Sequence, residues 1–340
     1  MFININNKIK IDNKSKTLII AEISANHLGN KKRFIEHIKK ASSCGADLVK
    51  IQSYEENDIS LNINNKRYKN VFDIYKKAKT PFKWHKEAFN FAVRNKITLF
   101  SSPFSIRAVD LLESLNCPIY KIASLEITNF QLMERISLTN KPIIMSIGAS
   151  NINEVRQALK VINKYHNKII LLYCVSAYPS KESDMNIKSI EYLKKKFKKN
   201  FIGLSDHTNS IDSSLVASLC GAKIIEKHFI IDNKKTYDSE FSILPKQLSL
   251  LSKNIVKYKS ILGTSKHSIK KKELDKRRYR RSFYAKKNIK KGEKFNDQNI
   301  ISLRPNIGLC ASKYFNLINK KSKKNYKKFS PISKNEIFWE

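Results

Sequence analysis

Two histidines that follow short apolar runs are the strongest candidates for metal chemistry. His207 lies in SDHT, two positions after the end of the run 201–205, and His228 closes the run 224–228 in EKHF. Neutral imidazoles bind Mn, Fe, Co or Zn, and nearby oxygen-bearing side chains (Glu22, Asp206) favour a Lewis-acid site over a closed structural one. The alternative is two histidines satisfied by hydrogen bonds near a core. We prefer the metal site because both histidines come at strand ends.

Two lysines in apolar surroundings indicate an anion site. Lys50 lies in DLVKIQ and Lys121 in IYKIAS, where an ammonium group is costly unless a negative charge compensates it. Hydroxyl groups interleave with them, at Ser102, Ser124, Ser146 and Ser205. Such a set suits a compact dianion, for example a phosphorylated carboxylate, better than an extended nucleic-acid backbone. The alternative is that the lysines are simply salt-bridged to Glu22 or Glu126.

Glu22 and Glu126 are the carboxylates that could move a proton in this setting, although ion pairing would also explain them. No Ser-His-Asp or Cys-His arrangement is evident for nucleophilic catalysis, and Cys174 is interpreted as an inert strand thiol. The candidate residues therefore favour acid–base and metal-assisted chemistry.

Eight short apolar or β-branched runs alternate with segments of helical periodicity. They cover residues 17–22, 48–52, 98–101, 119–122, 142–146, 169–174, 201–205 and 224–228. This alternation predicts an α/β fold, a closed (β/α)8 barrel, and an open doubly wound sheet is disfavoured because no G-x-G-x-x-G follows any run. The polar residues that end the runs would then converge on one rim. The stretch 53–81 has no assigned element and is expected to hang over that rim as a lid or substrate loop.

The last quarter of the chain contains a basic segment followed by an internal repeat. Residues 267–281 form a basic linker, with eight basic and two acidic residues between Lys270 and Arg281. Beyond it, AKKNIKKGEKFNDQNI (285–300) aligns without gaps on SKKNYKKFSPISKNEI (322–337), 37 residues later. This repeat predicts a small β-rich domain with internal pseudo-symmetry. We therefore expect a barrel domain at 1–266, the linker, and a small domain at 282–340.

The net charge of +37 invites a polyanion-binding interpretation. Lysine far outnumbers arginine, however, and the lysines are spread along the whole chain, as expected for a solvated surface under an A/T-rich coding background. We therefore expect no nucleic-acid partner. The longest apolar run, 169–175, is too short to span a bilayer, and the first residues offer no signal-peptide core. Five cysteines without a C-x-x-C pair favour the reducing cytoplasm.

Nine segments carry a further signal, namely IIAEISANHLGN, GADLVKIQSY, LFSSPFSIRAVDLLESLNCPIYKIASLEITN, KPIIMSIGAS, YCVSAYPS, GLSDHTNSI, GAKIIEKHF, RRSFYAKKNIKKGEKF and LRPNIGL. Together they resemble the sialic acid synthase family, and the variants AEISANH, CVSAYPS and YDSEFSI most resemble its pseudaminic acid synthase branch. The nine segments run in order from residue 19 to 309, so the resemblance covers nearly the full chain.

The resemblance implies a TIM barrel followed by an antifreeze-like (SAF) domain. It also implies a transferase that condenses phosphoenolpyruvate with 2,4-diacetamido-2,4,6-trideoxy-L-altrose, with the help of a divalent ion (Mn, Mg or Co), to give a nine-carbon 2-keto acid and phosphate. His207 and His228 fall on metal-ligand positions, and Glu22 and Glu126 on the catalytic carboxylates. The implied phosphoenolpyruvate site comprises Lys50, Ser102, Lys121, Ser124, Ser146, Ser176, Tyr178 and Ser205. The implied sugar contacts are Gln52, Asp238 and Arg304, the last supplied across a homodimer.

Some residues depart from the family pattern. Ser102 and Ser176 stand where the family pattern has Thr and Asn, and RPNIGL lacks a glycine of the commoner RPGxGI, which affects substrate detail rather than reaction type. Three other hypotheses stay open. They are a sialic or legionaminic acid synthase, a polyanion-binding protein, and a non-catalytic dimer scaffold built on a dead barrel.

Overall fold

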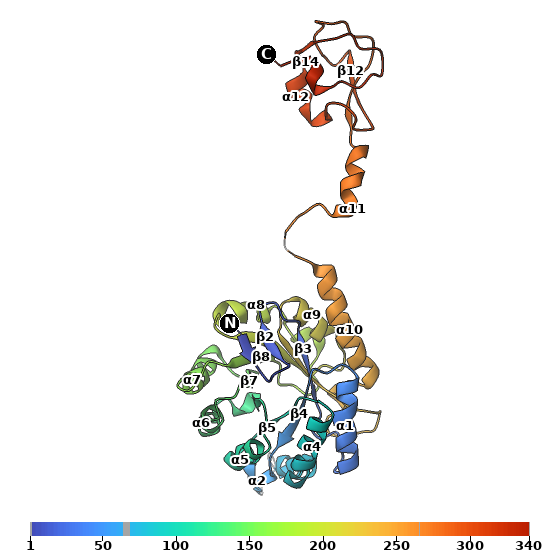
Figure 1. The fold of residues 1–340 in the computed structure, drawn as a ribbon. Coiled ribbons are helices and arrows are strands. Elements are labelled where there is room, and N and C mark those ends of the chain that lie inside the picture. The colour runs from blue at the N-terminus through green and yellow to red at the C-terminus, as the bar shows by residue number, and fades with distance from the viewer. Residues whose placement is uncertain (1, 64–68, 265, 340) are drawn as a thin grey trace. The chain divides into compact units, whose positions relative to one another are not determined.

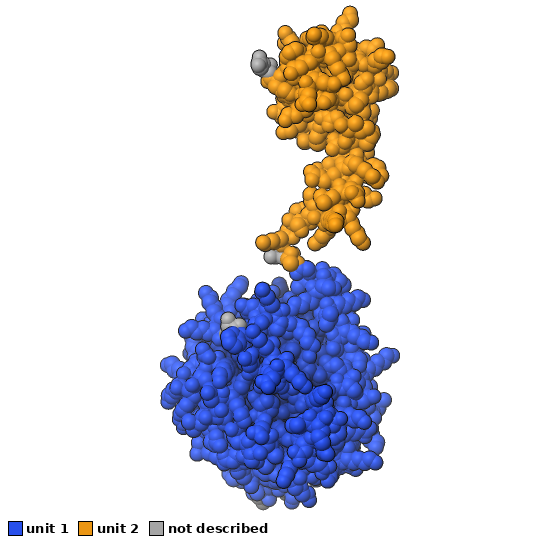
Figure 2. Space-filling view, in the orientation of Figure 1, with its two compact units in different colours: residues 1–263 blue, residues 264–340 orange. Residues whose placement is uncertain are grey.

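The computed structural model describes residues 2–63, 69–264 and 266–339. The chain divides into two compact units, Met1–Gly263 and Thr264–Glu340 (Figure 2). Each unit has its own buried apolar cluster and is described by itself. None of the described helices is long and apolar enough to cross a membrane.

The first unit is a closed barrel of eight parallel strands with helices around it (Figure 1). The strands are β3 (Leu18–Glu22), β4 (Leu48–Ser53), β5 (Leu99–Pro103), β6 (Tyr120–Ile122), β7 (Ile143–Ser146), β8 (Ile169–Cys174), β9 (Phe201–Asp206) and β10 (Ile224–His228). Each strand pairs with the next in sequence, and β10 pairs with both β9 and β3 to close the ring. The predicted (β/α)8 barrel is confirmed, with every predicted run lying on a strand.

The helices alternate with the strands as the periodicity predicts. They are α1 (Lys31–Ser43), α4 (Phe82–Arg94), α5 (Ile106–Ser114), α6 (Phe130–Leu138), α7 (Ile152–Asn163), α8 (Ser189–Lys196), α9 (Asp212–Leu219) and α10 (Pro245–Leu262). In α7, Asn151 and Glu154 form a reciprocal capping box at the start, and the buried face recurs at Val155, Ala158, Leu159 and Ile162. This i, i+3, i+4, i+7 spacing places one apolar stripe against the barrel.

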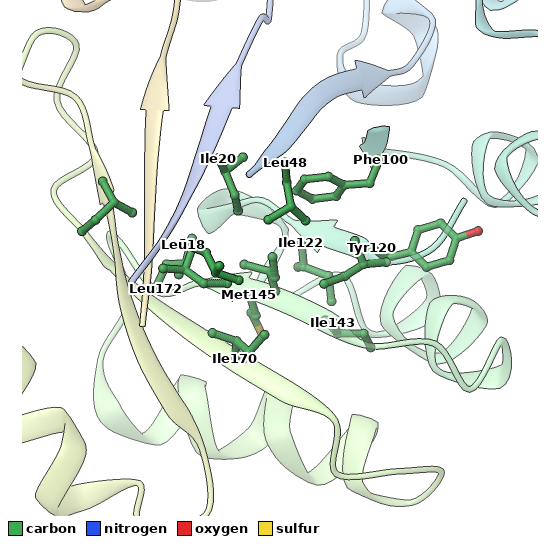
Figure 3. Close-up of a cluster of buried hydrophobic side chains, with 14 of the residues drawn as sticks. Leu18, Ile20, Leu48, Phe100, Tyr120, Ile122, Ile143, Met145, Ile170 and Leu172 are labelled. Atoms are coloured by element: carbon green, nitrogen blue, oxygen red, sulfur yellow. The ribbon is translucent and has the colours of Figure 1, made fainter. Parts of the chain in front are cut away.

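The barrel core is built from aliphatic and aromatic side chains of the strands (Figure 3). A short hairpin that sequence reasoning missed, β1 (Phe2–Asn4) with β2 (Lys10–Asp12), adds Ile3, Ile5 and Ile11 to the same cluster. The amide of Asn6 donates to Thr98 Oγ1 at 3.0 Å, directly before β5. The hairpin therefore lies at the amino ends of the strands, opposite the end where the polar residues gather.

The stretch 53–81, for which no element was predicted, contains helices. It carries α2 (Glu56–Ile59) and α3 (Lys69–Ala78), while its residues 64–68 lie outside the described part. The ring of Tyr54 meets the rings of Tyr75 and Phe104 edge-on, with centroids 5.7 and 5.4 Å apart. Aromatic packing therefore fixes α3 beside β4 and β5, so this segment is a packed insertion after β4.

The second unit contains the predicted internal repeat as paired strands. They are β11 (Ser282–Ala285), β12 (Ile300–Leu303), β13 (Lys321–Ser322) and β14 (Ile337–Phe338), with the short helix α12 (Tyr314–Leu317) between the two pairs. Ala285 pairs with Ile300, and 37 residues later Ser322 pairs with Ile337. The predicted linker is partly helical, in α11 (Lys271–Leu274) and a 3-10 turn at Asp275–Tyr279, and every described residue of 267–281 is exposed.

Hydrogen bonds between the two repeats reproduce the same symmetry. Ile289 and its counterpart Tyr326 exchange N–H···O bonds of 2.9 and 2.8 Å. Gly292 N donates to Ser322 O, and the counterpart Phe329 N donates to Ala285 O, both at 2.7 Å. A pseudo-twofold axis therefore passes between Ile289 and Tyr326, and the repeats intertwine rather than lie in tandem.

Candidate active site

Strand register brings the chemistry-bearing residues to one end of the barrel. His228 on β10 pairs with Glu22 on β3, and Glu22 pairs with Lys50 on β4. On the other side of β10, Glu226 pairs with Ser205 on β9. Because side chains two apart on a strand share a face, these residues point together into the barrel at the carboxyl ends of the strands.

A buried cluster of charges occupies this end of the barrel. Lys50 Nζ lies 2.7 Å from Glu22 Oε2 and 2.8 Å from Glu226 Oε1. Lys121 Nζ and Ser205 Oγ also donate to Glu226 Oε1, at 3.1 and 3.2 Å. All five side chains are buried. The lysines are thus ion-paired, as the alternative interpretation allowed for Glu22, but the shared partner is Glu226 and not Glu126.

Glu226 is the central residue of this cluster, and sequence reasoning gave it no role. The signal was present in IIEKH, where the period of two places Glu226 on the same face as His228 and Lys227 on the other face. The second carboxylate oxygen, Oε2, is buried and has no hydrogen-bond partner among the described residues. Glu226 can therefore accept a further donor.

The two lysines respond differently to this environment. Burial lowers the pKa of Lys121 to about 8. The carboxylate of Glu226 raises this pKa, but the positive charge of Lys50 lowers it further. Burial would also lower the pKa of Lys50, but the two carboxylates outweigh it and raise that pKa. Burial opposes ionisation of Glu226, yet Lys121 and Lys50 hold its pKa well below the usual range. Lys121 is therefore the cation whose charge changes in the mildly alkaline range.

Hydroxyl groups line the rest of a small cavity of about 70 Å³. The predicted residues around it are Glu22, Lys50, Gln52, Ser102, Lys121, Ser124, Ser146, Tyr178, Ser205, His207 and His228. Ser146 Oγ is buried without a partner in the described residues. A Cβ on Gly148 would lie 2.4 Å from Ser176 Oγ and 3.0 Å from Ser124 Oγ. The bare backbone at Gly148 therefore lets these hydroxyls approach one another.

The two predicted metal-binding histidines lie side by side, with ring centroids 5.4 Å apart. His207 Nδ1 lies 3.1 Å from the carbonyl oxygen of Val175, which can only accept, so this nitrogen carries the proton. Burial, with the neighbouring His228, lowers the pKa of His207 to about 3 and keeps the ring neutral. His228 Nδ1 lies 3.3 Å from Asp238 Oδ2. His207 therefore keeps Nε2 for an ion, with an oxygen acceptor behind Nδ1 as metal-binding histidines usually have, whereas Nδ1 of His228 is buried near Asp238 without a hydrogen bond among the described residues.

This donor set fits a divalent ion that completes its coordination with substrate or water. Within residues 2–63, 69–264 and 266–339, no group of three or more His, Cys, Asp or Glu side chains is arranged to hold a metal. If the two imidazoles hold an ion, they would be the protein's own donors among the described residues, which suits an open Lewis-acid site and not a closed structural one.

Asp206 does not contribute oxygen to this site, contrary to our expectation. Its carboxylate turns to the outer face of β9, where Oδ1 lies 3.1 Å from Lys227 Nζ. Successive side chains of a strand point to opposite faces, so Ser205 faces the cavity while Asp206 faces α9. Asp238, from the loop after β10, is the carboxylate that approaches His228 instead.

Asp238 and three other predicted residues lie outside the cavity wall. Glu126 follows β6 in a 3-10 turn and accepts from Asn129 Nδ2 at 2.8 Å. Ser176 lies behind the wall, with its Oγ 3.8 Å from Cys174 Sγ. Arg304 is exposed in the second unit. Cys174 and Phe104 line the cavity although neither was predicted as a site residue.

Comparison with known proteins identifies the family of this fold. Residues 37–267 match the NeuB family, and residues 280–337 match the SAF domain. A pseudaminic acid synthase of Helicobacter pylori is 39% identical, over 94% of this chain and 97% of that protein. An N,N'-diacetyllegionaminic acid synthase of Campylobacter jejuni is 37% identical, over 92% and 97%.

A solved structure gives the same result for the fold. The crystal structure of N-acetylneuraminic acid (sialic acid) synthetase from Leptospira borgpetersenii, in complex with citrate, superposes with a TM-score of 0.74 at 30% identity, covering 81% of this chain and 95% of that chain. The chain therefore belongs to the NeuB family and carries a SAF domain beyond its barrel.

Proposed function

We propose that this enzyme is a transferase that condenses phosphoenolpyruvate with 2,4-diacetamido-2,4,6-trideoxy-L-altrose to give pseudaminic acid and phosphate. Pseudaminic acid synthases of Helicobacter pylori and Campylobacter jejuni, 39% and 36% identical over more than nine tenths of the chain, support the choice of sugar. The observation that carries the reaction class is the pair of buried lysines, Lys50 and Lys121, in a cavity lined by hydroxyls.

Phosphoenolpyruvate suits this cavity because of its compact negative charge. Lys50 and Lys121 neutralise the anion, while the hydroxyls of Ser102, Ser124, Ser146 and Ser205 and the phenol of Tyr178 serve as its neutral partners; Ser176, behind the wall, does not face it directly. Both ammonium groups are already paired with carboxylates, Lys50 with Glu22 and Glu226 and Lys121 with Glu226. The anion must therefore compete with these carboxylates for the ammonium groups as it enters.

His207 and His228 would hold a divalent ion, Mn, Mg or Co, at the mouth of this cavity. Such an ion would supply Lewis-acid polarisation of the sugar's aldehyde oxygen. Gln52, whose amide donates to Ser24 Oγ at 3.0 Å, and Asp238 are proposed to orient the sugar. The aldehyde carbon then lies near C3 of the enol, which is the carbon that must form the new bond.

The chemistry follows from this arrangement. C3 of phosphoenolpyruvate attacks the aldehyde carbon, water adds to the positive charge left at C2, and the tetrahedral intermediate expels phosphate. Glu22 is the stronger candidate for activating the water, because it lines the cavity and Ser24 N donates to its Oε1 at 2.7 Å. Glu126 is proposed to move the proton on O1 of the sugar, and the two roles could be exchanged.

We also propose a homodimer in which Arg304 of one chain reaches the sugar site of the other. In its support, Arg304 is an exposed residue of the SAF unit, and the described residues of the connector 267–281 are all exposed. The residues of the site are otherwise those of the barrel. The five cysteines carry no disulfide, in keeping with the proposed cytoplasmic location.

Phosphate release is the experiment that tests this function. The enzyme is supplied with phosphoenolpyruvate, Mn²⁺ and a panel of amino sugars, namely the altrose derivative and the sugars that lead to legionaminic and N-acetylneuraminic acids. We expect the highest kcat/KM with the altrose derivative and no release without Mn²⁺ or in His207→Ala. A preference for another sugar would overturn the substrate assignment, and release without any sugar would overturn the reaction.

A further inference from the structure

A buried polar network lies directly behind the two metal-site histidines, on the outer faces of β9 and β10. Asp206 Oδ1 accepts from Lys227 Nζ at 3.1 Å and from Thr208 N and Oγ1 at 2.9 and 2.8 Å. Asp206 Oδ2 accepts from Ser214 Oγ of α9 at 2.5 Å. Lys227 Nζ also donates to Thr208 Oγ1 at 3.1 Å and to the carbonyl oxygen of Thr208. The exposed fraction of all four side chains is 0%.

The sequence positions of these residues are what connect them to the site. Asp206 immediately precedes His207, Thr208 immediately follows it, and Lys227 immediately precedes His228. The bond from Thr208 N to the Asp206 carboxylate closes a turn with His207 at its centre. On the other side, Ser180 N donates to His207 O at 3.0 Å. The backbone of His207 is therefore held by hydrogen bonds on both sides. Lys227, on the strand that carries His228, contacts both chain neighbours of His207, namely Asp206 and Thr208.

Stability alone does not account for this ion pair. A buried ion pair is often no more stabilising than well-packed apolar residues of similar volume, because both charges lose their hydration. On β9 and β10 the other side chains that alternate with the cavity-facing ones are apolar and buried, namely Ile202, Leu204 and Ile225. What the pair adds is a polar contact of defined geometry between β9 and β10, at the paired positions Asp206 and Lys227.

We propose that the Asp206–Lys227–Thr208 network is a positioning device that sets the two imidazoles of His207 and His228 for a divalent ion. The inference rests on the proposed metal site. None of these residues touches substrate or ion, since all of them act through the backbone of the histidines. Outer-shell partners of metal ligands commonly contribute about 10- to 100-fold in metal affinity. We therefore expect an effect of that size on ion binding and none on the anion site.

The test measures binding of Mn²⁺ alone to the full-length protein, and the absorption bands of bound Co²⁺, which report ligand geometry. Thr208→Val removes the hydroxyl that donates to Asp206 and accepts from Lys227, and Thr208→Ser keeps a hydroxyl there. Thr17→Val is the matched control, because Thr17 Oγ1 makes a buried hydrogen bond of 2.7 Å to Ala222 O beside the opposite end of β10. Lys227→Met and Asp206→Asn probe the ion pair itself.

Thr208→Val, Lys227→Met and Asp206→Asn should each weaken Mn²⁺ binding by at least about tenfold and shift the Co²⁺ bands. Thr208→Ser and Thr17→Val should bind as the wild type does. Phosphoenolpyruvate affinity in the absence of metal should stay within about twofold in all variants that fold. Because Lys227→Met leaves Asp206 in a buried site and can unfold the barrel, the two Thr208 variants alone are sufficient to decide.

Two outcomes would overturn the inference. Unchanged Mn²⁺ affinity in Thr208→Val would show that the network does not position the histidines. Equal losses of Mn²⁺ and phosphoenolpyruvate affinity would show a general loosening of the barrel instead. Failure of the metal site itself is distinguishable, because Mn²⁺ would then bind equally to the wild type and to His207→Ala.

Discussion

Lys121 Nζ and Glu226 Oε1 meet at 3.1 Å inside the barrel, although the two residues lie on strands that are not neighbours in the ring. The same oxygen of Glu226 also accepts from Lys50 and Ser205. The carboxylate of Glu226 thus fixes the positions of both cations that the proposed reaction needs. It remains their ion-pair partner until an anionic substrate binds.

Replacing Glu226 by Gln should destabilise the fold. Removing one partner of a buried ion pair commonly costs about 3–5 kcal/mol, because the remaining charges stay buried without compensation. The measurement is the free energy of unfolding with and without phosphoenolpyruvate, whose addition should stabilise Glu226→Gln more than the wild type. Glu87→Gln is the control, because the Lys31–Glu87 pair is exposed and should contribute at most about 1 kcal/mol. Similar small losses in both variants would contradict the role of Glu226.

Phosphoenolpyruvate affinity should fall as the pH rises above about 8, where Lys121 loses its charge in the free enzyme. The decrease should approach about tenfold per pH unit, measured by calorimetry between pH 7 and 10. In Lys121→Arg the guanidinium stays charged, so the affinity should be independent of pH over this range. The stability of the fold should change with pH in the opposite direction to the affinity. Because the pKa of Lys121 is lowered in the folded state, its buried charge destabilises the fold below pH 8. This destabilisation disappears as the pH rises towards 10.5, the pKa of the unfolded state.

Gly148→Ala should damage the anion site selectively. The new methyl group would lie 2.4 Å from Ser176 Oγ and 3.0 Å from both Ser124 Oγ and the backbone oxygen of Cys174, which cannot move aside easily. We expect the KM for phosphoenolpyruvate to rise at least about tenfold, which corresponds to about 1.4 kcal/mol, with little change in the KM for the sugar. Ala149→Gly is the control, since Ala149 already has a φ of 52° that glycine adopts without strain. A change confined to the sugar KM would refute this placement.

The two halves of the SAF unit should respond differently to alanine. Gly292 has a φ of 84°, and its pseudo-symmetric counterpart Phe329 adopts a φ of 62° without being glycine. Gly292→Ala should therefore lower the free energy of unfolding by about 1 kcal/mol, while Phe329→Ala should change it by less than half of that. Trp339 fluorescence in a Trp84→Phe background reports unfolding of this unit. Equal losses of unfolding free energy in Gly292→Ala and Phe329→Ala would contradict this prediction.

The proposed homodimer predicts complementation between two inactive chains. Arg304→Ala and His207→Ala proteins should each lack activity, and a mixture should recover it after subunit exchange. A mixed dimer contains one site in which both residues are wild type, so recovery should approach about a quarter of the wild-type rate if the chains mix at random. Exchange is demonstrated first with differently tagged chains. No recovery after exchange, or an active monomer, would refute the arrangement in trans.

The sequence by itself determined the barrel, its eight strands and the repeat of the second unit. These follow from local patterns, since strands buried on both faces read as short apolar runs and each run ends in polar residues where parallel strands meet the rim. The identities of Lys50, Lys121, His207 and His228 as residues of one site came from the same rule, and the structure brings all four around one cavity.

Only the tertiary structure decided which polar residues at the strand ends face inward. In SDH and EKH, neighbouring residues lie on opposite faces, so Asp206 and Lys227 turn outward while Glu226 and His228 turn to the cavity. A shift of one residue in register would exchange the two sets, and register is set by pairing with strands that are distant in sequence. Glu226 could therefore be recognised as the shared partner of Lys50 and Lys121 only after β4, β6 and β10 had been placed around one axis.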